Sequence, residues 1–410
     1  FIYEKIDKPL IKVLASMENL GVKIDKKYLE NLSSEFSKQI KVLESQIYRI
    51  TKKVFNIGSP KQLGEIMFDE MGLRGGKKTK MGNYSTDSSI LEELASDNEE
   101  IAKYVLDWRE LSKLKSTYTD ALVEQISPNT ARVHTSYASA ATITGRLSSN
   151  NPNLQNIPIR TENGKKIRHA FITENNHKLV SFDYSQIELR LTAEISGDNN
   201  LINAFKNGDD IHTLTALQIF GIKEKEINAD YRRKAKVINF GIIYGISPYG
   251  LAKQLSISNA EGKQYIEDYF KRFPKIKEYM EKKISFCRKN LYVETIFGRK
   301  CFIRGINDKN FSMRGFSERQ SINAPVQGTA ADIIKLAMIK IHEEIERKVI
   351  KARMLLQVHD ELVFEIEEKE LNKVIPQIKS IMETTHTIYK DFQVPLVVEY
   401  GIGNNWGESH

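Results

Sequence analysis

The sequence has 410 residues, of which 40% are hydrophobic and 28% are charged. A chain of this length and composition buries more than one core, so we expect two or three domains and exclude a disordered tail. Its 61 Lys and Arg exceed its 53 Asp and Glu, and the net charge of +8 favours a polyanionic partner without specifying a reaction.

The cysteine content and the hydropathy of the chain indicate the cellular compartment in which the protein is expected. The two cysteines, Cys287 and Cys301, show no paired ligand spacing, so neither a disulfide framework nor a zinc site is expected. No apolar run approaches the roughly 20 residues that a membrane helix needs, and the opening residues lack the form of a signal peptide. We therefore expect a reducing, cytoplasmic setting and no membrane partner.

The first part of the chain predicts two long helices and a basic loop. Apolar residues recur every three or four positions over 29–54, which is typical of an amphipathic helix, and Ser59-Pro60 predicts a helix start. A second helix is expected over 99–124. Residues 74–85 form a glycine-rich loop that holds three cations, Lys77, Lys78 and Lys80. This loop could grip phosphates, or it could be a solvated connection; the sequence leaves both open.

The second part predicts strands around a helical block. An apolar strand over 178–182 feeds a helix that begins at Gln186, and helices fill 199–289 with breaks at Gly208, Gly221, Gly245 and Pro274. Two further strands, 355–358 and 361–366, flank a tight hairpin at His359-Asp360.

Two acids at strand ends are the first candidates for chemistry. Asp183 follows the apolar strand, and Asp360 lies in the hairpin turn. A single Asp at a strand end is more often a cap, but two on one face of a sheet could hold two cations that activate an attacking oxygen and stabilise a leaving one. Magnesium suits such a site, since it takes hard oxygen ligands and is commonly held by one or two carboxylates plus substrate phosphates.

A stripe of cations and rings accompanies these acids. Arg232, Lys236, Phe240 and Tyr244 recur every four residues, which places them along one drifting face of a helix. The cations suit a triphosphate, with Lys236 as point charge or proton donor, and the rings suit a sugar and base. A partly buried amphipathic helix with a basic edge would show the same pattern.

Residues 183–190 (DYSQIELR), 232–245 (RRKAKVINFGIIYG) and 358–361 (VHDE) together resemble motifs A, B and C of the family A DNA polymerases, the class of bacterial DNA polymerase I. Residues 144–149 (TGRLSS) and 155–158 (QNIP) are similar to the primer-template segment of that family. Residues 318–320 (ERQ) and 323–332 (NAPVQGTAAD) also match. The resemblance covers nearly the whole chain.

The resemblance implies a helix-rich α+β fold shaped like a right hand, with a palm built on an antiparallel sheet. We expect a lead segment near the palm over 1–25, a thumb over 26–125, and fingers over 191–310. The palm would be split between 126–190, which holds Asp183, and 311–410, which holds Asp360.

The resemblance also implies roles at the centre. Asp183 would bridge two Mg²⁺ ions and Asp360 would hold the ion on the primer side, helped by the backbone carbonyl of Tyr184. Glu361 would sit close to the reaction as a catalytic residue without being an obligatory ligand.

The incoming nucleotide would be met by further residues. The resemblance assigns its phosphates to Arg232, Lys236 and His212, and packing on its sugar to Phe240. Glu188 would be the gate that excludes a 2′ hydroxyl, because a side chain over that position blocks it. Phe rather than Tyr at position 240 implies discrimination against dideoxynucleotides. The nucleotide set is completed by Gln186 and Tyr244.

Primer-template contacts follow from the remaining matches. His359 would touch the primer terminus. The residues expected to track the minor groove, where acceptors are nearly sequence-independent, are Arg146, Arg319, Asn323 and Gln327, and Gln155 lies in the matched primer-template segment.

The implied activity is that of a DNA-directed DNA polymerase, a nucleotidyltransferase that extends a primer with deoxynucleoside triphosphates and releases pyrophosphate. We expect a monomer in the bacterial cytoplasm, at the nucleoid, that serves repair and gap filling in replication; an organelle or phage polymerase remains an alternative. The chain begins where the polymerase module of the family begins, so no proofreading nuclease is expected in it.

Three rival functions share some of these features. A single-subunit RNA polymerase should lack a blocking side chain at the sugar gate, so Glu188 argues against it. A catalytically silent DNA clamp would need neither Asp183, Asp360 nor Lys236. A two-metal nuclease would need a separate acidic cluster, which the sequence does not offer.

Overall fold

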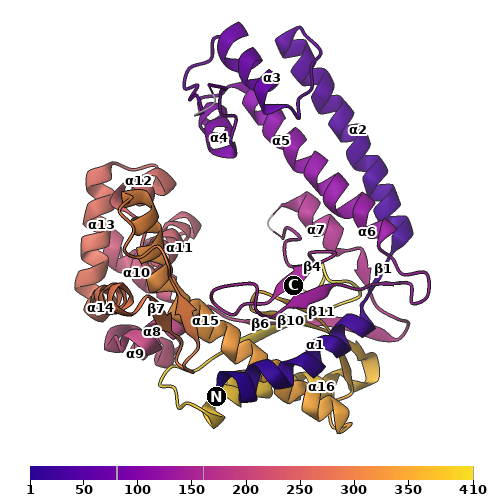
Figure 1. Cartoon of the computed structure of the whole chain (residues 1–410), viewed down its shortest axis with the longest axis vertical. Coiled ribbons are helices and arrows are strands. Elements are labelled where there is room, and N and C mark those ends of the chain that lie inside the picture. The colour runs from indigo at the N-terminus through magenta and orange to yellow at the C-terminus, as the bar shows by residue number, and fades with distance from the viewer. Residues whose placement is uncertain (80–81, 160, 410) are drawn as a thin grey trace.

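The computed structural model describes residues 1–79, 82–159 and 161–409. Two helical arms rise from a central antiparallel sheet, one formed by the residues after position 25 and the other by the residues around 200–290 (Figure 1). The fold is mixed α+β and rich in helix, which confirms the predicted class.

Four antiparallel strands form the central sheet in the order β11-β6-β10-β9. Their bounds are β6 His177–Tyr184, β9 Ala352–Val358, β10 Glu361–Glu367 and β11 Val398–Gly403. The three predicted strands are confirmed, with one correction: Asp183 lies inside β6 rather than after it. The strand extends because Asp183 pairs with Glu361 on one neighbour and Glu399 on the other.

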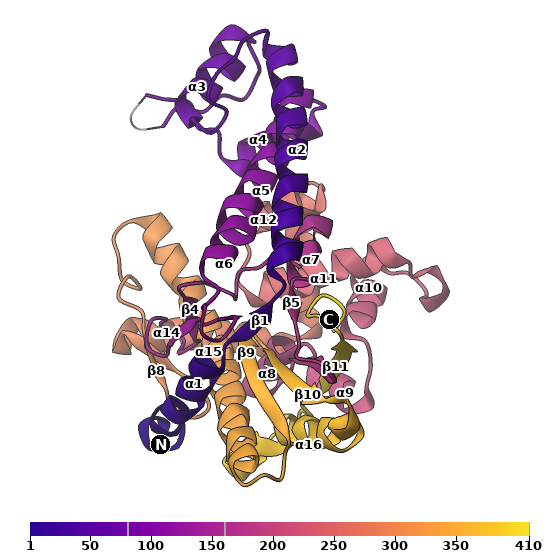
Figure 2. The same ribbon diagram turned by 90° about the vertical axis from the view of Figure 1, so that its right-hand side faces the viewer.

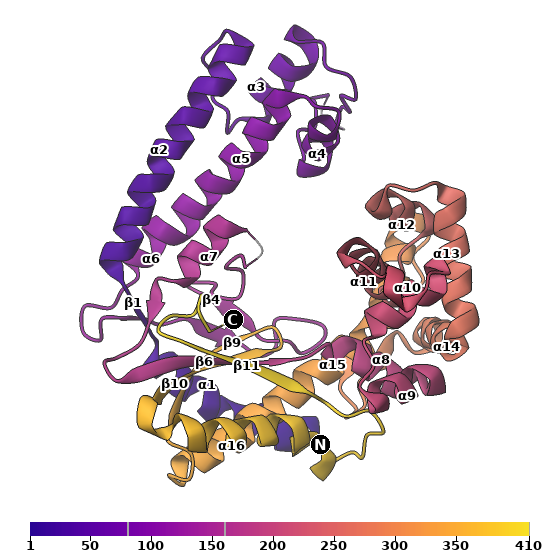
Figure 3. The ribbon, with the colours of Figure 1, turned by 180° about the vertical axis from the view of Figure 1, so that it is seen from behind.

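The two faces of the sheet belong to different cores, because side chains alternate along each strand. Phe182 and Phe364 face a large core that is shared with three helices beneath the sheet (Figure 3). These helices are α1 Lys8–Leu20, α15 Phe311–Glu346 and α16 Leu371–Thr384. Val363 faces a second core at the base of the first arm, and by alternation Asp183 and Glu361 point to this same face.

The first arm is a pair of long helices that ends in a small helical head. Its elements are α2 Lys26–Thr51, α3 Pro60–Gly64, η2 Glu65–Glu70, α4 Ser88–Ser96, α5 Glu100–Leu114, η3 Lys115–Asp120 and α6 Ala121–Glu124. The Ser59 side chain accepts from the backbone N–H of Gln62 and Pro60 begins α3, so the predicted start is confirmed.

Both long helices of this arm are predicted correctly apart from the two ends of the first, which begins at Lys26. The helix expected over 29–54 ends at Thr51, because Lys52 adopts a left-handed conformation with φ of 52°. Val54 therefore lies outside the helix and is 78% exposed. The helix expected over 99–124 is α5, η3 and α6 in succession.

The second arm is a block of short helices. Its elements are α8 Ile187–Ser196, α9 Asn199–Asn207, α10 Ile211–Phe220, η4 Glu224–Glu226, α11 Ala229–Ile243, α12 Pro248–Leu255, α13 Asn259–Arg272 and α14 Pro274–Asn290. The predicted breaks are confirmed: Gly208 and Gly221 end α9 and α10 with φ of 77° and 63°, and Pro274 begins α14.

Smaller elements connect these parts. Strands β1 Val22–Ile24, β2 Arg132–Val133 and β5 Phe171–Ile172 form one sheet, β3 Ser136–Ala138 pairs with β4 Ser148–Asn150, and β7 Tyr292–Glu294 pairs with β8 Lys300–Phe302. The other helices are η1 Ile2–Asp7, α7 Glu162–Arg168, η5 Glu368–Glu370 and η6 Thr385–Ile388. Figure 2 shows α1 running from the N-terminus at the foot of the molecule up to β1.

The expected domain limits fall mostly between elements. Positions 25, 125 and 310 are the residues that flank α2, α6 and α15, whereas position 190 lies within α8.

Cys287 and Cys301 are buried free thiols. Within the described residues, no helix combines the length and the apolar character needed to cross a bilayer.

Candidate active site

Asp183 and Asp360 meet at one end of the central sheet. The register pairs Asp183 with Glu361, and the backbone N–H of Tyr184 donates to the carbonyl of Asp360 at 3.2 Å. His359 turns the hairpin with a φ of 56°. Burial raises the pKa of Asp360, and the nearby negative charge of Glu188 raises it further. Two acids distant in sequence therefore share one acidic end of the sheet.

Glu361 is held by groups that the sequence did not single out. Its carboxylate accepts from Nε1 of Trp406 at 2.9 Å and lies 3.8 Å from Arg168. The Arg168 guanidinium in turn stacks 3.9 Å from the Trp406 ring centre, and all three residues are buried. Nothing local in the sequence indicates that Trp406 contacts Glu361, which lies 45 positions away.

Helix α11 carries the predicted stripe of cations and rings. Arg232 and Lys236 are exposed, and the rings of Phe240 and Tyr244 lie 6.1 Å apart at its end. Nε of Arg232 is 2.7 Å from the carboxylate of Asp210, which the sequence analysis did not identify. The Arg232 guanidinium is thus held in place by the residue that precedes α10 while it stays accessible.

His212, on α10, lies against this stripe. It is 2% exposed, its ring centre is 5.8 Å from that of Phe240, and burial lowers its pKa to about 4. The ring is therefore neutral at pH 7. Nδ2 of Asn239, a donor only, lies 3.0 Å from Nδ1, so Nδ1 accepts and the proton sits on Nε2. His212 can donate one hydrogen bond to an anion but brings no charge.

The Glu188 side chain contacts one candidate nucleotide-binding residue and one candidate DNA-binding residue. It lies in the first turn of α8, and its carboxylate accepts from the hydroxyl of Tyr244 and from the guanidinium of Arg146. Gln186 is the residue before this helix, with a φ of 52°. The side chain of Glu188 is therefore fixed between Tyr244 of the second arm and Arg146 beside β4 instead of pointing freely into solvent.

The candidate primer-template residues form two groups. Arg319, Asn323 and Gln327 are four residues apart on α15, which places them on one face of that helix. Gln155 donates through Nε2 to Oε1 of Gln357 at 3.0 Å.

The second group consists of Gln155 and Gln357, and Gln357 was not among the predicted site residues. Gln357, 3% exposed, donates through Nε2 to the carbonyl of His359 at 2.6 Å and so fastens the turn that bears Asp360. A polar residue at an inward position of a predicted strand was the available signal.

The loop lysines lie apart from this site. Lys77 and Lys78 are exposed on the loop between η2 and α4, at the head of the first arm, and Nζ of Lys78 lies 4.9 Å from the Tyr84 ring centre. Lys80 lies outside the described residues. The structure therefore does not bring Lys77 and Lys78 to the acids of the sheet.

The donor set at the acidic end fits a divalent cation that is completed by a substrate. Two carboxylates and a neighbouring backbone carbonyl are hard oxygen donors. Among the described residues, no cluster of three or more His, Cys, Asp and Glu side chains is arranged to hold a metal ion. Phosphate oxygens of a nucleotide would supply the remaining ligands.

Known proteins share this sequence and arrangement. DNA polymerase I of Rhizobium leguminosarum is 50% identical over all of this chain, which spans 40% of that protein. The thermostable DNA polymerase I of Thermus aquaticus is 46% identical over 99% of this chain, which spans 48% of it. The chain thus spans less than half the length of these relatives.

A solved structure and a family model agree with these relatives. The structure described as the POL domain of Pol1 from M. smegmatis, in complex with DNA primer-template and dNTP, superposes with a TM-score of 0.93 at 39% identity. That match covers 99% of this chain and 70% of the other. The family model for DNA polymerase family A matches residues 26–408. The chain therefore belongs to DNA polymerase family A.

Proposed function

We propose that this chain is a DNA-directed DNA polymerase that adds deoxynucleoside triphosphates to a primer 3′ end. The observation that carries the proposal is the meeting of Asp183 and Asp360 at one sheet end, with Lys236 and Arg232 exposed on α11. The primer 3′ oxygen forms a bond to the α-phosphorus, and its proton passes to solvent water. The bond between the α-phosphorus and the bridging oxygen breaks, and pyrophosphate leaves with a proton that Lys236 can supply.

Polymerases of family A depend generally on a divalent metal. Asp183, Asp360 and the backbone carbonyl of Tyr184 would hold two Mg²⁺ ions. The bound ions would lower the pKa of the attacking hydroxyl and stabilise the charge on the leaving oxygen. Glu361, held by Trp406 and Arg168, would set the local charge and the position of the hairpin.

The nucleotide would be held by α10 and α11. Arg232 can clamp phosphate oxygens in its planar fork, and neutral His212 can donate from Nε2. Phe240 would pack on the sugar, and Glu188 would occupy the space beside its 2′ carbon. Gln186 and Tyr244 would complete this surface, with Tyr244 already bound to the Glu188 carboxylate.

The DNA would lie between the arms. Arg146, Arg319, Asn323 and Gln327 would track its minor groove, while Gln155 and His359 would hold the primer terminus. The lysines of the loop in the first arm would contact phosphates further along the duplex. In this assignment the first arm, 26–125, is the thumb, the block 191–310 the fingers, and the sheet with its helices the palm.

The relatives are bacterial polymerases, so we place this activity in the bacterial cytoplasm, at the nucleoid. We assign it to repair and to the filling of gaps in replication. The chain would act as a monomer on primer-template DNA.

Single-nucleotide primer extension on four templates that differ in one templating base tests this function. With Mg²⁺, only the complementary deoxynucleotide should be added, pyrophosphate should appear in equal amount, and chelation of the metal should stop the reaction. The matching ribonucleotide and dideoxynucleotide should be poor substrates. Addition that ignores the template, or equal use of ribonucleotides, would reject the proposal.

A further inference from the structure

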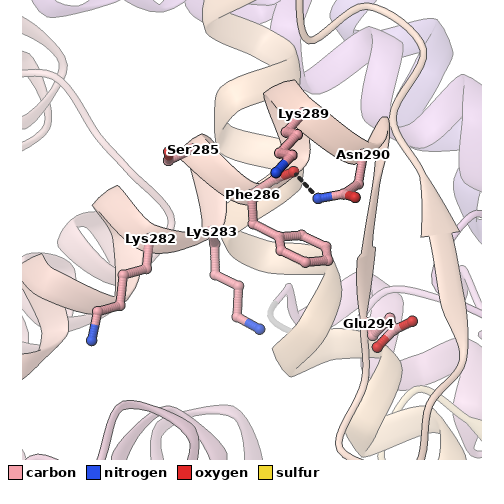
Figure 4. Close-up of a pocket in the computed structure, with 7 residues that line it drawn as sticks. All are labelled: Lys282, Lys283, Ser285, Phe286, Lys289, Asn290 and Glu294. Carbon is pink, nitrogen blue, oxygen red and sulfur yellow. Dashed lines mark hydrogen bonds between the residues drawn. The ribbon is translucent and has the colours of Figure 1, made fainter.

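A groove lies along α14, and neither Asp183 nor Asp360 is among the residues that line it. Its volume is about 700 Å³, and it is lined by one face of α14 together with Glu294 of β7. Figure 4 shows Lys282, Lys283 and Phe286 projecting from α14 toward the same open space, with Glu294 on the strand across from them. None of these residues has a part in the proposed reaction.

The groove is basic. Among the described residues that line it, three are lysines and one, Glu294, is acidic. Lys282 is paired with Glu278 at 2.5 Å, whereas the exposed Lys289 forms no ion pair with any residue in the described ranges. A surface with such an excess of cations attracts a polyanion rather than a second basic chain.

Exposed aromatic rings accompany the lysines. Phe286 is 42% exposed and lies edge-on to Tyr292, with ring centres 5.7 Å apart. Tyr292 contacts Phe302, 58% exposed, at 5.7 Å, and Lys300 holds its Nζ 4.6 Å from the Tyr292 ring centre. The cluster leaves two phenyl rings in solvent beside the cations. Rings interleaved with cations are the combination with which proteins bind single-stranded nucleic acid, by stacking on bases while cations follow the backbone.

We propose that this groove binds single-stranded DNA, namely the unpaired template strand ahead of the primer end. The inference rests on the proposed function, which supplies such a strand. Phe286 and Phe302 would stack on bases, and Lys282, Lys283 and Lys289 would accompany the phosphates.

The attachment of α14 to α15 indicates that the strand in this groove is the template and not a displaced strand. The hydroxyl of Tyr279 donates to the carbonyl of Ile322 at 2.7 Å, and Arg288 pairs with Glu318 at 2.5 Å. These contacts flank Arg319 and adjoin Asn323, to which we assign the primer-template duplex. The single strand that continues from that duplex is the template, whereas a displaced strand is not joined to it.

Fluorescence anisotropy on the whole chain tests the groove. The probes are a duplex with a template overhang of about 12 nucleotides, within the span of known single-strand sites, and the same duplex with a blunt end. Phe286→Ala should bind the overhang DNA roughly tenfold more weakly and leave blunt DNA unchanged, and Phe286→Tyr should restore binding. Lys289→Ala should lower the slope of log affinity against log salt by about 0.7 on the overhang probe.

Lys373→Ala is the matched control, because Lys373 is an exposed lysine on α16 beneath the sheet. It should leave both affinities unchanged. Equal losses on overhang and blunt DNA would overturn the proposal, as would no loss on either. A loss seen only with a probe that carries a displaced flap would overturn the assignment to template. Failure of the wild type to extend a primer would reject the polymerase function, and is read in a separate assay.

Discussion

At the scale of single residues, the Glu188 carboxylate links the second arm to the segment beside β4. It accepts from Tyr244 at the end of α11 and from Arg146 beside β4, so one acid positions a nucleotide candidate and a DNA candidate at once. A side chain held from two sides keeps its place when a nucleotide enters. Such a fixed side chain can exclude a 2′ hydroxyl by its volume.

Replacing this side chain tests the gate. Glu188→Ala should raise the use of ribonucleotides relative to deoxynucleotides by tenfold or more, since a small change of fit in a pocket is worth that much. Steady-state insertion of one matched nucleotide measures the ratio. Glu188→Gln keeps the volume and is the control: it should retain most of the exclusion. A gain as large in Glu188→Gln as in Glu188→Ala would show that charge, not volume, sets the gate.

Several site residues were predictable because their signals are local. The four-residue spacing of Arg232, Lys236 and Phe240 directly indicates one helix face, and the apolar strand that leads to Asp183 is visible in the sequence. The clamp of Trp406 and Arg168 on Glu361 was not predictable, since it joins three distant segments. Only the folded sheet brings them together.

At the scale of elements, the short helix η6 carries a buried titratable group. His386 is 3% exposed, and its ring centre lies 4.5 Å from that of Phe392. Burial lowers its pKa to about 4, although Asp391 acts in the opposite direction. The folded chain therefore holds a neutral imidazole where the unfolded chain would take up a proton below about pH 6.5.

This difference predicts how stability depends on pH. The pKa of His386 is lower in the folded chain than in the unfolded chain. Its contribution to the free energy of unfolding is therefore present above pH 6.5 and is lost as pH falls toward 4. His386→Phe should flatten the dependence in that window by up to about 1.4 kcal/mol per pH unit. Urea unfolding at pH 7, 6 and 5 measures this pH dependence. Part of the dependence remains in the variant, because His212 has a similar pKa. Parallel curves for wild type and variant would contradict the prediction.

The apolar spacing in the sequence predicts helices better than it predicts where they end. Apolar spacing predicted α2 well but continued it to Val54, because the pattern does not register the left-handed turn at Lys52. The breaks at Gly208 and Gly221 were predictable, since glycine adopts that conformation without strain.

At the scale of the whole molecule, a buried ionic cluster ties the N-terminal segment to the palm. Arg299 reaches Asp332 of α15 at 2.7 Å and Asp7 of η1 at 2.9 Å. Asp332 and Lys335 are fully buried, and burial lowers the pKa of Lys335 to about 8. The cluster closes the contact between η1, the β7–β8 hairpin and α15.

Removing the central cation should be costly. Arg299→Ala leaves the Asp332 carboxylate buried with too few partners, and we expect a loss of about 3 to 5 kcal/mol in the free energy of unfolding. The urea midpoint checks this. Lys369→Ala removes the exposed partner of Glu367 and should leave the midpoint unchanged. An Arg299→Ala midpoint equal to that of the wild type would show that solvent compensates the cluster.

The individual helices and strands followed from periodic signals in the sequence, whereas the α+β class and the right-hand arrangement were implied by the resemblance to family A polymerases. The ionic cluster did not follow from the sequence, since it joins residues 292 positions apart. Neither did the strand order β11-β6-β10-β9, which places the last strand beside β6. Long-range pairing is determined by the packing of the whole chain.

The most direct test of the account is primer extension by Asp360→Asn beside the wild type, with affinity for primer-template measured on the same samples. Asparagine keeps the size of the side chain and removes the charge that a divalent cation needs. The account predicts extension reduced by about 100- to 1,000-fold, a loss typical of removing a key electrostatic contact, with DNA affinity within about twofold. Undiminished extension, or loss of DNA binding in a folded variant, would contradict the assignment of the reaction to Asp183 and Asp360.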